Sequence, residues 1–489
     1  MRSIALLIIA PAVLLTAGRG ALAQGAADSA AIQRRLEAVE AELHAIRRQQ
    51  AAASPPWAQP VRLPEVEQEV SHRGSAGYES LPPAYACPSS SCPPTAAMCA
   101  CGGGAAASKF PSVTLSGFFQ ADAGWFSQSP LNLTTVGDIQ DGADFRRARL
   151  LAKGDVYNNV GYMVEMDFAF PGRPSFMDVY VEGREIPLVG TLRVGQWRQP
   201  YGMDELTSVR ELTFLERALP FAFAPFRQIG VGLMNHDPSE SITWAASVFR
   251  FPSDVFGSNV GDDGGYSMAS RVTALPWFIE DYQLVHIGFD YCYIDPGNDA
   301  VQYRNQPEFF VGETGGGLVP TGVPSQVPFF VDTGAINTVN THLYGVELGT
   351  SWGPVYAQSE LQYAVVNQIN GPLLAFPGAY AQVGWFLTGE SRAYSRTNGV
   401  FSRVQPIRNF GFGPQDGFGA WELAFRWSHL DLNDDNIQGG RLNDLTLGLN
   451  WYLNRYTKLQ LNNIHAFLDN PTFGPSEANI VAARAQVDF

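Results

Sequence analysis

The chain has few charged residues and almost no lysine. Only 16% of its 489 residues are charged, and three of its 32 basic residues are lysine, at Lys109, Lys153 and Lys458. Its formal net charge is -15, so it has no basic face that could neutralise a row of phosphates. Nucleic acid is therefore excluded as a partner. Disorder of the whole chain is excluded as well, because the apolar content is 45%.

Catalytic motifs are missing too. There is no Walker loop, no H-E-x-x-H and no G-x-S-x-G, and the seven histidines form no close pairs along the chain. We therefore predict that the protein is not an enzyme and that it needs neither a cofactor nor a metal.

Long apolar runs are absent beyond the N-terminus. Arg2 precedes a 14-residue apolar run, 4–17, and Ala21-Leu22-Ala23 offers the small residues of a signal-peptidase site. We interpret 1–23 as a cleaved signal peptide, because a membrane-anchoring helix needs roughly 20 apolar residues. A helical membrane protein is excluded, which leaves a secreted, periplasmic or barrel-inserted chain.

Residues 24–50 carry a short heptad pattern. We predict a coiled coil there, in an arrangement that favours trimers or tetramers, and the alternative is a single amphipathic helix. The apolar positions are spaced by four and three residues, at Ile32, Leu36, Val39, Leu43 and Ile46.

Residues 51–110 have no periodicity and are rich in Pro, Gly and Cys, which is typical of a linker. It holds Cys87, Cys92, Cys99 and Cys101. We expect disulfides or interchain bonds, because a thiolate metal site would want paired C-x-x-C spacings. The fifth cysteine, Cys292, is expected to be a packing residue in a strand.

Beyond residue 110 the pattern changes to period two. The chain holds 49 Gly, 33 Pro and 59 aromatic residues, a mixture that favours strands and turns over a helical bundle. The last segment shows the alternation: Val481, Ala483, Ala485, Val487 and Phe489 lie between Ala482, Arg484, Gln486 and Asp488.

This alternation fits a soluble β-sandwich or an outer-membrane barrel, and three features favour the barrel. Aromatic residues gather near the segment ends, and the segments have the length of tilted membrane-spanning strands. Tight turns such as Asn158-Asn159, Trp352-Gly353-Pro354 and Asn454-Arg455 alternate with long loops such as 295–340. We read this alternation as short periplasmic turns and long outer loops.

We therefore predict an all-β domain over 111–489, a 16-stranded antiparallel transmembrane β-barrel, which is wide enough for an aqueous channel. An even number of strands returns the C-terminus to the periplasm, and the terminal Phe489 is common in such barrels. The expected strands are 112–126, 144–157, 160–169, 175–184, 190–198, 228–236, 241–250, 266–275, 283–294, 341–352, 354–366, 378–388, 418–430, 441–453, 455–467 and 479–489.

Several stretches together resemble the phosphate-selective porin O and P family. They follow one another in the same order as in the family, and they span 112–489. They are Ser116-Gly117-Phe118-Phe119-Gln120-Ala121-Asp122, Phe145-Arg146-Arg147-Ala148-Arg149-Leu150, Val194-Gly195-Gln196-Trp197 with Pro200-Tyr201-Gly202, Thr213-Phe214-Leu215-Glu216-Arg217-Ala218-Leu219-Pro220, Gly419-Ala420-Trp421-Glu422-Leu423, and Leu447-Gly448-Leu449-Asn450-Trp451-Tyr452-Leu453-Asn454.

The resemblance implies a trimeric porin of the bacterial outer membrane. It would be a passive channel for small hydrophilic solutes, with ions or phosphate as permeants, contacting membrane lipid and inserted by the barrel assembly machinery. The third loop, about 199–227, would fold inward and narrow the pore. We expect a short helix over Thr213–Pro220, with Phe214 and Leu215 packed against the wall.

The resemblance also implies basic residues at the pore. Arg146 and Arg147 match the paired arginines of the family's second strand, and by alternation Arg147, Arg149 and Lys153 share its lumen face. Two bases of phosphate-selective members are replaced, by Phe118 and Glu205. The candidates for anion contact are Arg146, Arg147, Arg149, Lys153, Arg210, Arg217, Arg227 and Arg304.

Acidic residues share the lumen faces. Residues 111–489 hold 23 basic against 39 acidic residues, and facing rows of acids and bases are typical of a general diffusion pore. The alternative for each is a salt bridge that stiffens the wall. The acidic positions are Asp122, Asp155, Glu165, Asp167, Asp178, Glu347, Glu360 and Glu422.

Two alternatives stay open. Within the porin class, phosphate selectivity competes with general diffusion. In a different class, the barrel would be a structural anchor whose N-terminal coiled coil tethers the outer membrane to the cell wall.

Overall fold

The computed structural model describes residues 109–169, 174–253, 265–311 and 327–489, all within the compact unit Ala100–Phe489. The predicted signal peptide, the predicted coiled coil and the four linker cysteines lie outside the described residues. None of the helices in these ranges is long and apolar enough to cross a membrane.

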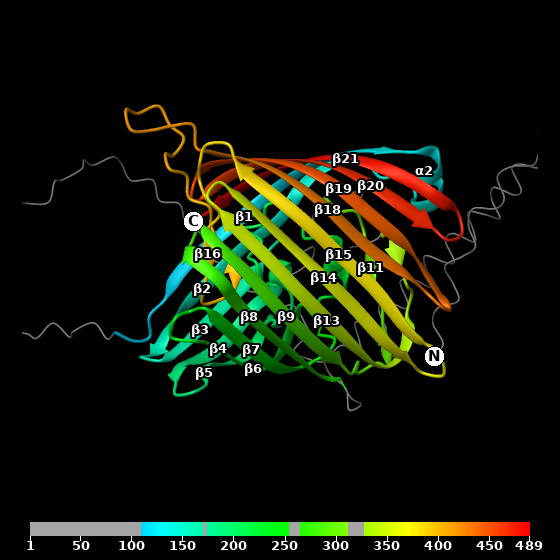
Figure 1. Cartoon of the computed structure of the whole chain (residues 1–489), viewed down its shortest axis with the longest axis horizontal. Helices are drawn as coiled ribbons and strands as arrows, with labels where there is room; N and C mark the ends of the chain where they lie inside the picture. The colour runs from blue at the N-terminus through cyan, green and yellow to red at the C-terminus, as the bar shows by residue number, and fades with distance from the viewer. Residues whose placement is uncertain (1–108, 170–173, 254–264, 312–326) are drawn as a thin grey trace, which may run out of the picture. The chain divides into compact units, whose positions relative to one another are not determined.

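The described chain forms a closed antiparallel barrel (Figure 1). Each long strand pairs with the next one along the chain, and β21 pairs with β1, which closes the sheet. The prediction of a 16-stranded barrel is confirmed. Its long strands are β1 (Thr114–Gln128), β2 (Gly142–Tyr157), β3 (Val160–Asp167), β4 (Ser175–Ile186), β5 (Gly190–Arg198), β6 (Arg227–His236), β7 (Ile242–Arg250), β8 (Tyr266–Glu280), β9 (Gln283–Ile294), β13 (Ile336–Trp352), β14 (Val355–Gln368), β15 (Leu373–Phe386), β18 (Ala420–Asp434), β19 (Ile437–Asn454), β20 (Thr457–Asn470) and β21 (Gly474–Asp488).

Shorter elements lie in the connections between the long strands. The first connection contains the helix α2 (Pro130–Val136), and the third contains α3 (Met203–Leu206) and the 3-10 helix η2 (Leu219–Phe223). The short strands are β10 (Ala300–Val301), β11 (Arg304–Asn305), β12 (Val331–Asp332), β16 (Tyr394–Ser395) and β17 (Val400–Phe401).

Strand β18 shows why the sequence folds in this way. Leu423, Phe425 and Trp427 are exposed on the outer face, whereas Glu422 and Arg426 are buried on the lumen face. Successive side chains of a strand point to opposite faces, so the apolar set meets lipid and the polar set meets the lumen.

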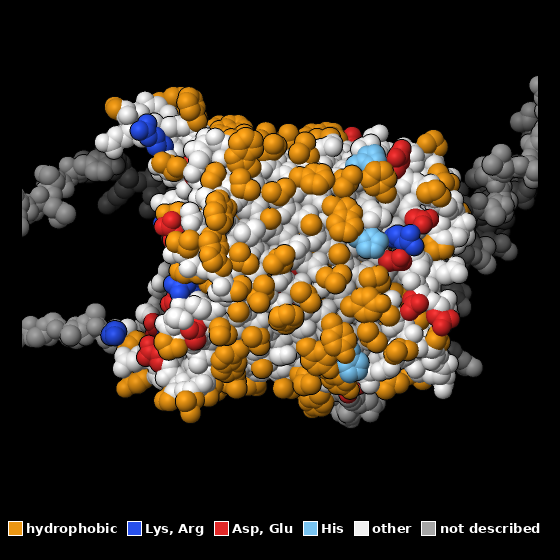
Figure 2. Space-filling view, viewed as in Figure 1, with side chains coloured by type: hydrophobic (Ala, Val, Ile, Leu, Met, Phe, Trp, Pro, Cys, Tyr) orange, Lys and Arg blue, Asp and Glu red, His pale blue; other side chains and the backbone are white. Residues whose placement is uncertain are grey.

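Aromatic rings mark the level of one membrane interface. Trp277 stacks on Trp352 with ring centroids 5.0 Å apart, and Trp421 stacks on Trp451 at the same separation. Figure 2 shows the apolar side chains spread over the outer wall, with charged side chains gathered towards its two ends. Such a band, with aromatic residues at its edge, is typical of a barrel in a bilayer.

The barrel has two different ends, which we call the turn end and the loop end. The turn end holds tight turns such as Asn158-Asn159 and Gly353-Pro354, and Phe489 and Ser112 lie there as well. The loop end holds the connections 129–141 and 199–226, and the described parts, 295–311 and 327–335, of the connection between β9 and β13. The predicted contrast between turns and loops is correct for this part of the chain.

In the second half of the barrel, the predicted contrast between short turns at one end and long loops at the other is wrong. The turn end there carries a long connection, 387–419, between β15 and β18, while the loop end has short turns such as Asp435-Asn436. We call 387–419 the turn-end insert. It is long because its first part enters the lumen, where Arg271 donates to the carbonyl oxygens of Asn398 and Gly399. Another part, coloured orange, projects beyond the turn end in Figure 1.

The buried apolar core lies inside the barrel. Tyr201, Leu219 and Phe223 of the third connection pack with Phe376 and Leu430 of the wall. Cys292 belongs to the same cluster and is fully buried, as predicted for a packing residue. The inserted connections therefore fill much of the lumen and leave only part of its cross-section open.

We predict that Leu447→Arg destabilises the barrel by roughly 2–4 kcal/mol, because it places a charge at the middle of the lipid-facing surface. Leu447 lies near the centre of β19 and is 52% exposed. Chemical unfolding in lipid vesicles measures the change. The control Thr472→Arg, at a loop-end turn, should cost much less, and equal costs would contradict the assignment of the outer face.

Candidate pore and its constriction

The third connection crosses the lumen and forms the constriction, and we call residues 199–226 the constriction segment. Its backbone is held by the far wall: Lys458 Nζ donates to the carbonyl oxygen of Leu212 at 2.9 Å, and Asn450 Nδ2 donates to that of Thr213 at 2.8 Å. Its 3-10 helix η2 and its short helix α3 lie on either side of this stretch.

Phe214 and Leu215 are buried against the wall, as the sequence predicted. The ring of Phe214 lies under the guanidinium of Arg426, 4.4 Å from the ring centroid. The predicted helix over Thr213–Pro220 is wrong. The carbonyl oxygens of that stretch accept hydrogen bonds from Asn450, Gln460 and arginine side chains of the wall instead of from its own backbone. Only the later residues, from Leu219, turn into a 3-10 helix.

Three arginines converge on Glu216 at the centre of the constriction segment. Arg146 Nε lies 3.0 Å from one carboxylate oxygen, Arg147 Nη2 lies 2.8 Å from the other, and Arg484 Nη2 lies 2.8 Å from the first. Arg484 also forms a two-bond pair with Asp122, at 2.7 Å for each bond. The three arginines hold the pKa of Glu216 well below its usual range, although burial opposes ionisation.

A β-bulge brings both consecutive arginines to the lumen. Gln120 pairs with Arg147 and Ala121 pairs with Phe145, so Arg146 is the extra residue of β2. Strict alternation would send Arg146 and Arg147 to opposite faces, and the bulge removes that conflict.

A second group of charges lies on β2, β3, β4 and β6. Arg149 Nε is 2.7 Å from Asp167, and Arg227 Nε is 2.7 Å from Asp178. Glu165 lies between these pairs, 3.7 Å from Arg149 and 3.8 Å from Arg227. The candidate bases and candidate acids of these strands therefore neutralise one another.

The two candidate bases of the constriction segment, Arg217 and Arg210, contact carbonyl oxygens and an aromatic ring. Arg217 donates to the carbonyl oxygens of Asp204, Glu205 and Thr207 at 2.7–2.8 Å. Arg210 and Arg149 both lie over the Phe118 ring, with guanidinium-to-centroid distances of 5.5 and 5.6 Å.

Three candidates lie apart from these clusters. Arg304 belongs to β11 in the long loop-end connection, where it lies over the ring of Phe329, and Lys153 is exposed towards the turn end of β2. Glu422 accepts hydrogen bonds from Tyr356, Tyr452 and Asn450 rather than from an arginine.

Three further lumen bases were not predicted from the sequence. Arg271 pairs with Glu347 at 2.7 Å, Arg426 Nε donates to Glu308 at 2.9 Å, and Arg484 occupies the Glu216 cluster. Arg426 and Arg484 lie on the polar faces of alternating segments, so the alternation itself carried the signal for both.

The constriction segment and the turn-end insert meet at Glu211. Arg403 lies 2.9 Å from the Glu211 carboxylate and also pairs with Asp488, and Arg392 donates to the Glu211 carbonyl oxygen. The insert is anchored to the opposite wall as well, since Tyr394 and His286 share a hydrogen bond of 2.6 Å. No motif in the sequence indicated this junction.

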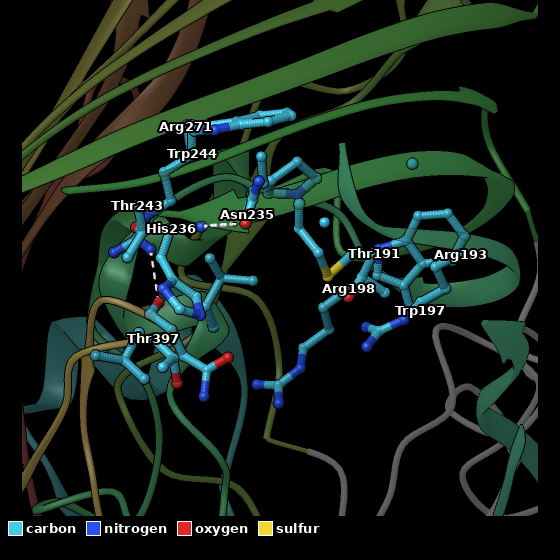
Figure 3. A pocket seen from close by; sticks show the side chains of 18 of the residues that line it. Thr191, Arg193, Trp197, Arg198, Asn235, His236, Thr243, Trp244, Arg271 and Thr397 are labelled. Atoms are coloured by element: carbon cyan, nitrogen blue, oxygen red, sulfur yellow. Dashed lines mark hydrogen bonds between the residues drawn. The ribbon is translucent and has the colours of Figure 1, made fainter. Parts of the chain in front are cut away.

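A chamber of about 800 Å³ remains open on the turn-end side of the constriction. Strands β4 to β8 form its wall, and the constriction segment and the turn-end insert form its other sides (Figure 3). In the described ranges, no group of three or more His, Cys, Asp or Glu side chains is placed to hold a metal ion.

We predict that Glu216→Gln raises the chloride-to-potassium permeability ratio by roughly tenfold. A unit charge about 6 Å from a permeant ion in a water-filled pore is worth about 0.7 kcal/mol, and removing the negative charge beside three arginines favours chloride and disfavours potassium by this amount each. Zero-current potentials across a salt gradient measure the ratio. The control Glu240→Gln, at a turn-end ion pair, should leave it unchanged, and an unchanged ratio in Glu216→Gln would contradict the account.

We predict a second, pH-dependent effect at Glu205. Burial raises the pKa of Glu205 to about 8, so its carboxyl is mostly neutral at pH 6 and charged at pH 9. Raising the pH across this range adds a negative charge to the constriction and should lower the permeability ratio. Glu205→Gln should reduce the part of the shift centred near pH 8, and an identical pH profile would show that Glu205 does not titrate there.

Known proteins match this chain over its barrel. A family model described as "Phosphate-selective porin O and P" matches residues 113–489. An uncharacterized protein of Caulobacter vibrioides is 27% identical over 395 residues, which cover 77% of this chain and 74% of that protein. Porin O of Pseudomonas aeruginosa is 24% identical over 386 residues, which cover 74% of this chain and 84% of that protein.

Among solved structures, an anion-selective porin from Comamonas acidovorans aligns with a TM-score of 0.44 and 12% identity, over 77% of this chain and 99% of that one. The family match extends over most of the chain and includes all sixteen long strands. The chain therefore belongs to the phosphate-selective porin O and P family, and it is an outer-membrane porin.

Proposed function

We propose that this porin is a general diffusion channel for small hydrophilic solutes, with a weak preference for anions and no catalytic activity. The observation that carries the proposal is the neutralisation of the constriction by Glu216. Arg146, Arg147 and Arg484 share the two carboxylates of Glu216 and Asp122, so this cluster has an excess of only one positive charge.

A tight phosphate site would need several cations free to replace the hydration of the anion. Arg149 and Arg227 each face a carboxylate at 2.7 Å, so neither is free in this sense. Phe118 and Glu205 stand where the resemblance implies bases in phosphate-selective members. These replacements support weak anion preference over phosphate selectivity.

We infer that the barrels assemble as trimers with the turn end facing the periplasm. The family resemblance and the heptad pattern of 24–50 support the trimer. The chain enters β1 and leaves β21 at the turn end, where Ser112 donates to Asp155 and Phe489 pairs with Gly117. This arrangement supports a periplasmic location for 24–110, divided into coiled coil and linker as predicted from the sequence.

The orientation proposed for the barrel also implies contacts with membrane lipid and with the barrel assembly machinery. The exposed apolar wall would contact outer-membrane lipid, and the exposed C-terminal Phe489 suits recognition by the barrel assembly machinery during insertion. Small ions, including phosphate at low affinity, would be permeants.

The alternative function is that of an anchor, in which the coiled coil tethers the membrane to the cell wall. Deleting 24–110 separates the two functions. We expect the truncated porin to keep most of its solute permeability, measured by liposome swelling. A defect of the cell envelope with unchanged permeability would favour an additional tether, and loss of permeability would contradict an independent barrel channel.

The proposed selectivity is tested on the full mature protein in planar bilayers. We expect open channels whose zero-current potential across a potassium chloride gradient indicates a small excess of anion permeability. Channels that are strongly anion-selective would contradict the neutralised constriction. A correctly folded, heat-modifiable protein without channels would contradict the diffusion pore itself.

A further inference from the structure

The chamber on the turn-end side of the constriction contains four arginines, and three of them are paired. Arg184 pairs with Asp155, Arg193 pairs with Glu182 at 2.7 Å, and Arg271 pairs with Glu347. The fourth, Arg198, stands at the end of β5 and extends into the open part of the chamber (Figure 3). Among the described residues, no carboxylate forms an ion pair with Arg198.

Arg198 is held in place by backbone oxygens instead. Its Nη1 donates to the carbonyl oxygens of Glu205 and Thr207, at 2.5 and 2.8 Å. A guanidinium has five N–H groups, and the other three, on Nε and Nη2, donate to no described residue. The side chain is only partly buried, so these donors can meet a solute in the chamber.

Four acids line the chamber, Asp178, Glu182, Glu185 and Glu211, and none of them forms an ion pair with Arg198. Asp178 is engaged by Arg227 at 2.7 Å, and Glu211 is engaged by Arg403 at 2.9 Å. Glu182 already forms the pair with Arg193. Arg198 is therefore the charged group of the chamber that is best placed to bind an anion.

Hydroxyl and amide groups make up much of the remaining lining. Thr191 and Asn235 come from the wall, and Thr397 and Asn398 come from the turn-end insert. Figure 3 shows Thr191, Asn235 and Thr397 around the same space as Arg198. Such side chains exchange hydrogen bonds with sugar-like hydroxyls, because each can donate and accept.

We propose that this chamber is a binding subsite for small polyhydroxylated monocarboxylates, with Arg198 as the anchor for the carboxylate. A guanidinium binds a carboxylate through two parallel hydrogen bonds, which a single unpaired arginine can supply. The volume of about 800 Å³ lies within the range of small-molecule sites. The proposal rests on the channel function proposed above and adds a solute class to it.

The test uses the full mature porin in planar bilayers, with gluconate added to either side in potassium chloride. We expect gluconate to reduce the chloride conductance in a saturable way. Arg198→Gln should raise the half-blocking concentration about tenfold or more, since it removes a charge-assisted pair of hydrogen bonds. The matched control Arg184→Gln, from a paired arginine of the same chamber, should change it less than about twofold.

A second variant tests the hydroxyl contacts without touching the arginine. Thr191→Val should weaken the block by gluconate and leave the block by propionate, which lacks hydroxyls, unchanged. This comparison remains decisive even where Arg198→Gln fails to fold. Equal effects on the two acids would overturn the assignment to polyhydroxylated solutes.

The outcomes separate the two proposals. Absence of channels from the folded wild-type protein overturns the diffusion pore. Open channels without gluconate block, or with block that Arg198→Gln leaves unchanged, overturn the subsite alone. Inorganic phosphate that blocks at a lower concentration than gluconate, and loses this advantage in Arg198→Gln, would make the chamber a phosphate site and overturn the monocarboxylate assignment.

Discussion

The structure depends on the rule that a backbone inside a membrane must satisfy its own hydrogen bonds. A sheet meets this rule only when it has no free edge, and here β21 pairs with β1 from Phe118 opposite Asp488 to Gln128 opposite Ala478. Closure then fixes two environments. Lipid surrounds the outside, so every charged side chain of the central wall is directed inward, where arginines and carboxylates meet at short range.

The concentration of charged side chains in the lumen determines the electrostatic field in the pore. A charge removed from water is costly unless it is paired and hydrogen-bonded, so the buried arginines of the lumen have taken carboxylates or carbonyl oxygens as partners. Glu216 does this for three arginines at the constriction. The same pairs that stabilise the inserted segment therefore also reduce the field that a permeant anion meets. Arg198 and Arg217 differ because carbonyl oxygens hold them without neutralising them, and of the two only Arg198 lines the chamber.

Alternation along the chain was sufficient to predict the sixteen strands, the lipid face of β18 and the lumen positions of Arg147 and Arg149. These features depend on local order, since side-chain direction repeats every two residues. The inward position of Arg146 depends on a bulge, and the pairing of Glu216 with Arg484 joins residues far apart in sequence, so local periodicity could not reveal either. The turn-end insert was missed because loop length alone does not tell whether a connection enters the lumen.

The most direct test of the central claim, that carboxylates neutralise the arginines of the constriction, is a phosphate titration of the chloride conductance of wild-type channels at constant ionic strength. The account predicts a shallow decline without saturation at low phosphate, because Arg146, Arg147, Arg149 and Arg227 are already paired. Saturable block at low phosphate that persists in Arg198→Gln would contradict it and would mean that these arginines leave their carboxylates to bind the anion.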